Sequence, residues 1–276
     1  MNALEIHGLT KQRGDFVLRG LELTLPAGCI MGLIGENGAG KSTTIRLILN
    51  ALSRDGGTVA VYGKDNRALT PLEREDIGAV LDEVGLPEYM TARQIGCMMA
   101  GIFARWQPEV YRGYLRRLAL PEDKPFRDFS RGMKMKLGLA VALSHQPKLL
   151  LLDEATSGLD PVVRDEILTI FADFTRDEEH AVLLSSHIVS DLEKICDYIA
   201  FLHKGRLLLC EEKDRLTEAY GILRGGAEDI DPAAVCGRHT TPYGTEYLVR
   251  RDAVPVGMAL GQVNIEDLFV FMAKEV

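Results

Sequence analysis

The stretch Gly35-Glu36-Asn37-Gly38-Ala39-Gly40-Lys41-Ser42-Thr43 decides the fold of this chain. Residues 35–42 fit the phosphate-loop pattern G-x-x-x-x-G-K-[ST] at every position. The glycines let the backbone bend around an anion, and the amides that follow open a helix whose dipole favours negative charge. Lys41 can reach the β- and γ-phosphates, Ser42 can bind Mg²⁺, and Thr43 is placed for the α-phosphate. The stretch therefore predicts a site for Mg·ATP.

The flanks of this loop predict the fold class. A short apolar strand at residues 29–34 leads into the loop, and the helix after it has one apolar face. Other segments are either continuously apolar or alternate between apolar and polar residues, as strands do. Helical stretches separate those strands that come later in the chain. These expected strands are residues 4–9, 21–25, 58–62, 149–152, 181–184 and 198–202. The order predicts an α/β P-loop NTPase with a mostly parallel sheet and an N-terminal antiparallel β part.

Two further regions depart from this alternation. Residues 83–146 read as an inserted helical subdomain, with helices expected at 92–106, 110–118 and 133–144. A Gly-, Ala-, Asp- and Pro-rich break at 225–237 precedes a strand expected at 245–249 and a helix at 265–274. We therefore expect an ATPase domain over residues 1–215 and a small C-terminal appendage over residues 216–276.

Bulk properties exclude several classes of protein. No apolar run approaches the roughly 20 residues of a membrane-spanning helix, and the N-terminus has no signal-peptide pattern, so we expect a soluble intracellular protein. The formal charge of −8 argues against a broad nucleic-acid surface. The five cysteines form no CxxC pair, which supports neither a zinc site nor a disulfide framework.

A second acidic motif can serve the phosphate loop. Residues 149–152 are four leucines, and Asp153 and Glu154 follow at the end of this buried strand. A nucleotide site needs a carboxylate for magnesium and a group that positions the attacking water. Asp153 is expected to hold Mg²⁺ through water, and Glu154 to act as general base.

Taken together, the motifs resemble the ATP-binding subunit of an ABC transporter over residues 2–215. The family signature LSGGQ is similar to FSRGM here, matched at Ser130 and Gly132. By itself FSRGM could equally be the capped start of a helix. The resemblance implies that Ser130 and Gly132 face the γ-phosphate bound by an opposite subunit. It also implies that Asp160 reaches across that dimer and that His187 contacts the γ-phosphate.

Three residues depart from the family pattern. Asp82 stands where the family has glutamine; it could bind Mg²⁺ or a water, or lie in an ordinary acidic loop. Arg13 stands where an aromatic residue stacks on adenine, and a guanidinium plane can also stack on a base. Phe16 is a nearby substitute for that role. Arg131, inside the signature, adds charge near the phosphates.

The resemblance implies a subunit that binds and hydrolyses ATP and energises a separate membrane permease together with a second, identical or different, cassette. The chain also resembles a bacterial single-cassette exporter subgroup linked to peptides, drugs and antibiotics, in the run around Trp106, Tyr111 and Tyr114, in residues 129–137 (FSRGMKMKL) and in residues 187–193. The chain would then be cytoplasmic and bound to the inner face of the membrane. The methionine-rich residues 90–106 could dock the permease, although core packing is the common use of methionine. The alternative is a soluble ABC-type ATPase that is not coupled to transport.

Overall fold

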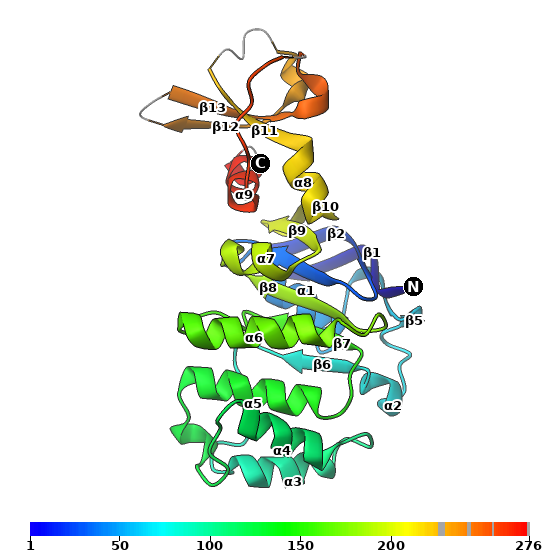
Figure 1. The fold of residues 1–276 in the computed structure, drawn as a ribbon. Coiled ribbons are helices and arrows are strands. Elements are labelled where there is room, and N and C mark those ends of the chain that lie inside the picture. Colours follow the sequence, from blue (N-terminus) through cyan, green and yellow to red (C-terminus); the bar gives the residue numbers. More distant parts are fainter. Residues whose placement is uncertain (226–229, 242–243, 256, 275–276) are drawn as a thin grey trace.

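The computed structural model describes residues 1–225, 230–241, 244–255 and 257–274 of the chain. Its strands are β1 (Asn2–Arg13), β2 (Phe16–Pro26), β3 (Ile30–Ile34), β4 (Gly56–Val61), β5 (Lys64–Asp65), β6 (Ile77–Val80), β7 (Leu149–Asp153), β8 (Ala181–Ser186), β9 (Tyr198–His203), β10 (Arg206–Glu212), β11 (Tyr220–Arg224), β12 (Val235–Thr241) and β13 (Gly244–Arg250). Its α-helices are α1 (Lys41–Ile48), α2 (Pro71–Arg74), α3 (Ala92–Ala100), α4 (Pro108–Arg117), α5 (Arg131–Leu143), α6 (Pro161–Phe174), α7 (Val189–Ile195), α8 (Lys213–Ala219) and α9 (Ile265–Lys274). Figure 1 shows the layers stacked along one long axis, with α3 and α4 at one end and β11–β13 at the other.

The central sheet has six strands in the order β10-β9-β3-β8-β7-β6. All of its neighbouring strands pair in parallel except β10, which is antiparallel to β9 at one edge. Successive side chains of a strand point to opposite faces, and the leucines of β7 follow this rule. Leu150 and Leu152 join the core beneath α5 to α7, whereas Leu149 and Leu151 join the core shared with α1 and the N-terminal sheet. The expected parallel α/β class is confirmed.

The N-terminal strands form a separate antiparallel sheet in the order β2-β1-β4-β5. Its apolar residues, including Leu4, Ile6 and Leu9 of β1, are buried against one face of the central sheet. The phosphate loop follows β3 of the central sheet, and its Gly40 lies against Phe16 of β2, so residues of both sheets border the loop.

The helical block, which we define as α3 to α5, contains the three expected helices, with α4 at Pro108–Arg117 instead of 110–118, and two of the other boundaries differ for visible reasons. The helix expected over 92–106 ends at Ala100, because the amides of Ala104 and Arg105 donate to the Glu75 carboxylate instead of continuing the helix. The helix expected from residue 133 begins at Arg131, since the hydroxyl of Ser130 accepts the amide of Met133 and caps it.

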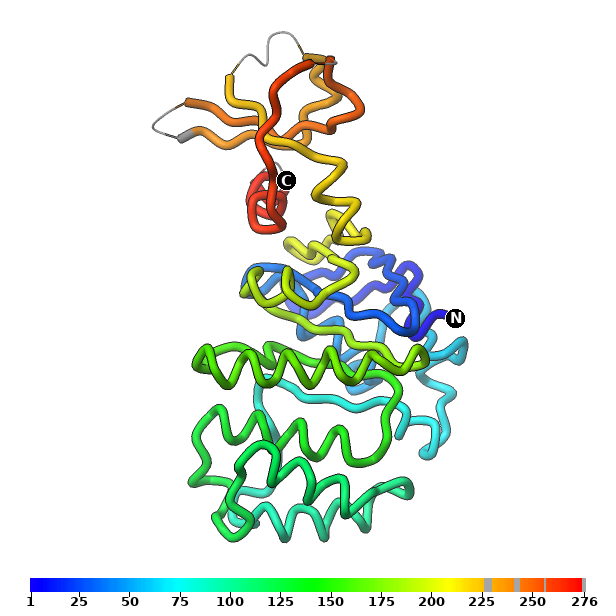
Figure 2. The backbone as a smooth tube through the Cα atoms, viewed as in Figure 1, coloured from blue at the N-terminus to red at the C-terminus, as the bar shows by residue number. Residues whose placement is uncertain are grey.

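The C-terminal residues form a three-stranded sheet, β11-β13-β12, and α9. The helix expected at 265–274 is confirmed, and the strand expected at 245–249 lies within β13. Figure 2 shows α9 lying between this sheet and the rest of the molecule. Its Phe269 ring packs 5.5 Å from that of Phe201 in β9, and its first amide, that of Ile265, donates to Glu193 of α7 at 2.8 Å. These two contacts fasten α9 to the central sheet and to α7.

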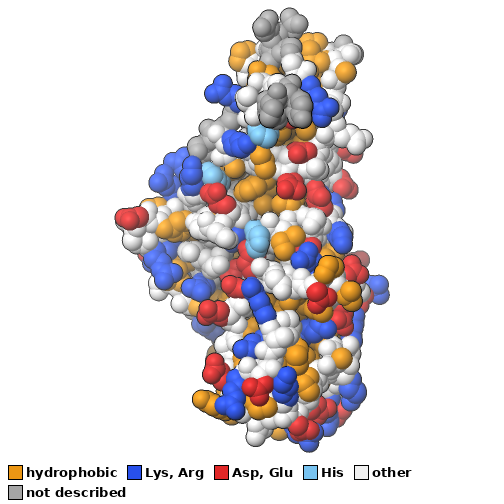
Figure 3. Space-filling view, turned by 90° about the vertical axis from the view of Figure 1, so that its left-hand side faces the viewer, with side chains coloured by type: hydrophobic (Ala, Val, Ile, Leu, Met, Phe, Trp, Pro, Cys, Tyr) orange, Lys and Arg blue, Asp and Glu red, His pale blue; other side chains and the backbone are white. Residues whose placement is uncertain are grey.

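Within the described residues, no helix is both long and apolar enough to cross a bilayer. On the face drawn in Figure 3, acidic and basic side chains are intermingled.

Candidate active site

The candidate catalytic residues meet at the carboxyl edge of the parallel sheet. Ile34, which ends β3 just before the phosphate loop, pairs with Ser186 of β8. On the other side of β8, Ser185 pairs with Asp153 at the end of β7. Loops that follow adjacent parallel strands leave the sheet at one edge, where α/β proteins bind their ligands. The topology therefore brings the phosphate loop, Asp153, Glu154 and His187 together.

Two glycines of the loop are required by close approach. A Cβ on Gly35 would lie 2.5 Å from the carbonyl oxygen of Leu202, a distance that real Cβ atoms do not reach. Gly40 has a φ of +114°, and a Cβ there would lie 2.7 Å from the ring of Phe16. Both positions therefore exclude any residue with a side chain, for tertiary reasons that the motif alone does not state.

Lys41 is buried, with 5% of its surface exposed, and its ammonium group faces the loop and the end of β7. Nζ donates to the carbonyl oxygen of Gly35 at 2.6 Å and lies 3.1 Å from Oε1 of Glu154. A buried ammonium needs such partners to offset its desolvation. Lys41 is thus held at the mouth of the anion-binding loop.

Glu154 has a φ of +52°, a left-handed backbone that is uncommon for a residue with a side chain and often marks a functional site. Its amide donates to the carbonyl oxygen of Ser185 at 3.1 Å. Its carboxylate is shared between two cations or potential cations, with Oε1 facing Lys41 and Oε2 lying 2.7 Å from Nδ1 of His187. Because a carboxylate only accepts, Nδ1 of His187 carries the hydrogen, and Nε2 remains for another partner.

Ser185 organises the acidic pair, and sequence reasoning passed over it. Its buried hydroxyl donates to Oδ1 of Asp153 at 2.6 Å and accepts the amide of Glu154 at 3.2 Å. Asp153 itself is 2% exposed. The signal that could have found Ser185 is its position two residues before His187, at the end of the strand next to the acidic one.

The nucleotide pocket encloses about 370 Å³. It is lined by Arg13, Phe16, Glu36, Asn37, Gly38, Gly40, Lys41, Ser42, Thr43, Asp82 and Glu154. Seven of the nine predicted loop residues, all except Gly35 and Ala39, therefore line one cavity, together with both candidates for the adenine contact. Ala39 is buried behind the loop, and the amide of Gly205 donates to its carbonyl oxygen.

The residues expected to serve a second subunit surround a different cavity. Ser130, Gly132 and Asp160 line a pocket of about 500 Å³, which shares no lining residue with the nucleotide pocket. Asp160 caps α6, since its Oδ1 accepts the amides of Val162 and Val163 at 3.1 Å each. The chain thus brings Lys41, Glu154 and His187 together but keeps the signature segment apart from them.

The oxygen groups near the loop suit a magnesium ion. Mg²⁺ prefers hard oxygen ligands and is commonly held by one or two protein groups plus substrate phosphates. Ser42 offers a hydroxyl at the pocket wall, and Asp153 offers a carboxylate held in place by Ser185. Asp82 also lines the pocket, but its Oδ1 accepts from Nη2 of Arg131 at 2.9 Å. Ser42 and Asp153 therefore fit the ion, whereas Asp82 is shared with an arginine.

Comparisons with known proteins agree with this geometry. Residues 18–157 match the family model described as "ABC transporter". The chain is 28% identical to "Bacitracin transport ATP-binding protein BcrA" of Enterococcus faecalis, over 95% of this chain and 87% of that protein. It is 31% identical to "ABC transporter ATP-binding protein YtrB" of Bacillus subtilis (strain 168), over 79% and 74% of the two chains. With "Lantibiotic transport ATP-binding protein SrtF" of Streptococcus pyogenes it shares 32% identity, over 76% and 91%.

Solved structures show the same fold. A structure described as "Structure of ATP binding subunit of ABC transporter" superposes with a TM-score of 0.71 at 26% identity, over 78% of this chain and 92% of that one. A dimeric ATP-binding cassette in a post-hydrolysis state, bound to ADP and Pi, superposes with a TM-score of 0.67 at 19% identity, over 76% and 98%. The phosphate loop, the acidic pair after β7 and these similarities lead to one conclusion: the chain belongs to the ABC transporter family, as an ATP-binding subunit that hydrolyses ATP.

Proposed function

We propose that this chain energises the export of peptide-like antibiotics or drugs through a separate membrane permease, as one of two cassettes that close on ATP. Residues 1–215 would form its ATPase domain, and residues 216–276 a small C-terminal appendage of the same subunit. In the cell the chain would lie at the cytoplasmic face of the membrane, held there by the permease.

The separation of the two pockets carries this proposal. Lys41, Ser42 and Glu154 belong to the nucleotide pocket, whereas Ser130, Gly132 and Asp160 line another. The first turn of α5 lies at the positive end of the helix dipole, which suits a phosphate. Since that helix start does not line the pocket of its own subunit, it is suited to the nucleotide of a second cassette.

The roles of the residues follow from their positions. Glu154 polarises the attacking water, His187 orients Glu154 and offers Nε2 to the γ-phosphate, and Lys41 binds the β- and γ-phosphates. When bound, Mg²⁺ supplies charge neutralisation between the phosphates. Ser42 would hold it directly and Asp153 through water, while the backbone amides of the loop hold the remaining phosphate oxygens. Either Arg13 or Phe16 would contact the adenine.

The names of two relatives support the class of cargo. The similarity to a bacitracin transport subunit extends over 95% of the chain, and a lantibiotic transport subunit is 32% identical. A solved cassette of this fold is a dimer. These likenesses favour the transport of peptide antibiotics, with an identical or different cassette as the partner.

The permease contact is assigned to the helical block. A groove of about 590 Å³ lies between the segment after β6 and the start of α5, lined by residues 82–86, Glu88, Phe126, Phe129, Arg131, Lys134 and Met135. Apolar rings and charged side chains both line it, as suits the amphipathic cytoplasmic segment of a membrane protein. Residues 90–106, next to this groove, complete the docking side.

The test is the Glu154→Gln variant of the full chain. Removing the base should lower ATP hydrolysis by about 10²- to 10⁴-fold while ATP still binds. The unhydrolysed ATP should then hold two cassettes together, so size-exclusion chromatography with light scattering should show an ATP-dependent dimer. Glu178→Gln, on the exposed turn before β8, is the matched control and should behave like the wild type.

Three outcomes would contradict parts of the proposal. Normal hydrolysis by Glu154→Gln would remove Glu154 from its role as base. If the variant stays monomeric both alone and with its permease and partner cassette in lipid nanodiscs, the two-cassette model fails. Absence of any bacitracin- or lantibiotic-dependent stimulation of the reconstituted ATPase would overturn the assignment of cargo.

A further inference from the structure

The helical block is attached to the ATPase core at both ends of β6, the edge strand of the parallel sheet. Glu75 and Asp76 lie just before this strand, and Asp82 lies just after it. Each end makes ionic contacts with the helical block, but the two attachments differ in burial. The attachment before β6 is buried, whereas the attachment after β6 is exposed to solvent.

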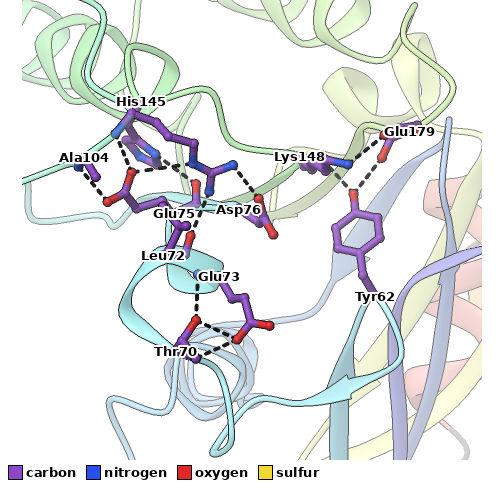
Figure 4. A network of polar contacts seen from close by, with 11 residues as sticks. Tyr62, Thr70, Leu72, Glu73, Glu75, Asp76, Ala104, His145, Lys148 and Glu179 are labelled. Carbon is purple, nitrogen blue, oxygen red and sulfur yellow. Dashed lines mark hydrogen bonds and ion pairs between the residues drawn. The ribbon is translucent and has the colours of Figure 1, made fainter.

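The attachment before β6 is buried and has several partners, and we call it the Glu75 clamp. The carboxylate of Glu75, whose residue is 7% exposed, accepts the amides of Ala104 and Arg105 at 2.8 and 2.9 Å. The Arg105 guanidinium donates to Asp76 at 2.7 Å, and Nδ1 of His145 lies 3.0 Å from the carbonyl oxygen of Glu75 (Figure 4). Breaking it would leave a buried carboxylate without partners, which is costly.

The attachment after β6 is one exposed ion pair. Nη2 of Arg131 donates to Oδ1 of Asp82 at 2.9 Å, with 55% and 52% of the two side chains exposed. Pairs of this kind are weak and are screened by salt. The guanidinium also lies against the backbone of Gly158, since a Cβ there would be 3.1 Å from Nη1. Arg131 therefore touches the segments after both β6 and β7.

The Asp82–Arg131 ion pair lies between three cavities: the nucleotide pocket, the 590 Å³ groove and the 500 Å³ pocket. Asp82 lines both the nucleotide pocket and the 590 Å³ groove. Arg131 lines both that groove and the 500 Å³ pocket that holds Ser130 and Asp160. A change in one cavity that moves Asp82 or Arg131 therefore also alters the walls of the other cavities that these two side chains line.

We propose that Arg131 is a positioning residue that holds Asp82 in the free subunit and must release it before the start of α5 meets the nucleotide of a second cassette. The Glu75 clamp stays closed and serves as the fixed point about which the helical block swings. This inference rests on the proposed two-cassette function. It depends on the charges of both residues, because a neutral side chain at position 82 would form no ion pair with Arg131.

The pair itself is tested on the nucleotide-free chain by amide hydrogen exchange with mass spectrometry. Asp82→Asn and Arg131→Gln should each raise exchange in peptides covering 79–90 and 129–136, and the double variant should raise it no further. Peptides covering 72–76 and 101–107, which contain the clamp, should be unchanged. Additive effects, or no effect, would overturn the pairing. Asp123→Asn breaks the exposed Arg93–Asp123 pair and serves as control.

The consequence for closure is tested in the Glu154→Gln background. Asp82→Asn should lower the ATP concentration for half-maximal association by about two- to five-fold, the range expected for one exposed ion pair. The same substitution should have no effect when Arg131 is already Gln. An equal shift of the half-maximal ATP concentration with Arg131 and with Gln at position 131 would mean that Asp82 acts through magnesium alone. That result would overturn the proposal that Arg131 holds Asp82. If Glu154→Gln associates neither alone nor with its permease and partner cassette, the two-cassette proposal fails, while the exchange data still decide the ion pair.

Discussion

Oε2 of Glu154 lies 2.7 Å from Nδ1 of His187, although 33 positions separate the two residues in the chain. The contact exists because β7 and β8 are parallel neighbours, so that the residues after each strand leave the sheet at the same edge. The other oxygen of Glu154 faces Lys41 at 3.1 Å. A triphosphate that binds Lys41 therefore competes with Glu154 for the same ammonium group. Phosphate binding is thus linked to the position of the base.

His187→Ala should slow hydrolysis more than it weakens binding. The variant removes the group that orients Glu154, and a misplaced catalytic group costs about ten- to hundred-fold in rate. Nucleotide affinity, measured by fluorescence titration with a labelled ATP, should change by less than about three-fold, since Lys41 and the loop amides remain. His7→Ala, at an exposed histidine on β1, is the control. A parallel loss of affinity and rate would show that His187 mainly binds substrate.

Ser185→Ala should destabilise the fold and the magnesium site together. It removes the donor to Asp153 and leaves a buried carboxylate short of a partner, at a cost of about 1–3 kcal/mol in urea denaturation. The Mg²⁺ concentration for half-maximal ATP hydrolysis should rise. Ser186→Ala is a matched control, because that hydroxyl accepts the amide of Ile188 and does not touch Asp153. An unchanged Mg²⁺ dependence in Ser185→Ala would argue against Asp153 as the magnesium carboxylate.

Gly35→Ala and Gly113→Ala should have opposite signs. At Gly35 the new methyl group would meet the carbonyl oxygen of Leu202 at 2.5 Å, so backbone must move; a loss of about 1–3 kcal/mol is expected. At Gly113, in α4, no atom lies within 4 Å of the new Cβ, and alanine should stabilise the helix by about 0.5–1 kcal/mol. Both changes in the free energy of unfolding are to be measured by urea denaturation. Equal effects at the two positions would contradict the tight approach at Gly35.

Acid should weaken the Glu75 clamp, beginning near neutral pH. Burial lowers the pKa of His145 below its ordinary 6.5, although the hydrogen bond to the Glu75 carbonyl opposes this. The unfolded chain therefore binds the proton first, and the stability that His145 contributes above about pH 6.5 is lost as the pH falls. The loss has a limiting slope of about 1.4 kcal/mol per pH unit for one proton.

His145→Phe removes this titration and preserves an aromatic ring against Phe103, on which His145 stacks at 4.2 Å. Between pH 7.5 and 5.5 the urea midpoint should fall less in the variant than in the wild type. Below that range both proteins should lose stability, because the pKa of Glu75 is also lowered: burial raises it, but the amides of Arg105 and Ala104 outweigh burial. Parallel curves from pH 7.5 to 5.5 would contradict the assignment to His145.

Much of the fold could be predicted because its signals are local. The four leucines before Asp153 are buried in β7, and the periodic apolar residues of 265–274 form α9 as expected. The helix expected to reach residue 106 stops at Ala100, because a carboxylate from before β6 takes the amides of Ala104 and Arg105. No local pattern around residue 101 names that distant partner.

By itself the sequence determined which residue types are present for phosphate, magnesium and water, because a phosphate loop needs glycines, a lysine and a hydroxyl in one short run. Tertiary structure alone decided which of them touch. Ser185 joins Asp153 to Glu154 through strand register, and Arg131 takes the carboxylate of Asp82 across 49 positions. The physical reason is that short-range spacing specifies backbone shape, whereas the pairing of charges depends on how packed strands and helices bring distant side chains within bonding distance.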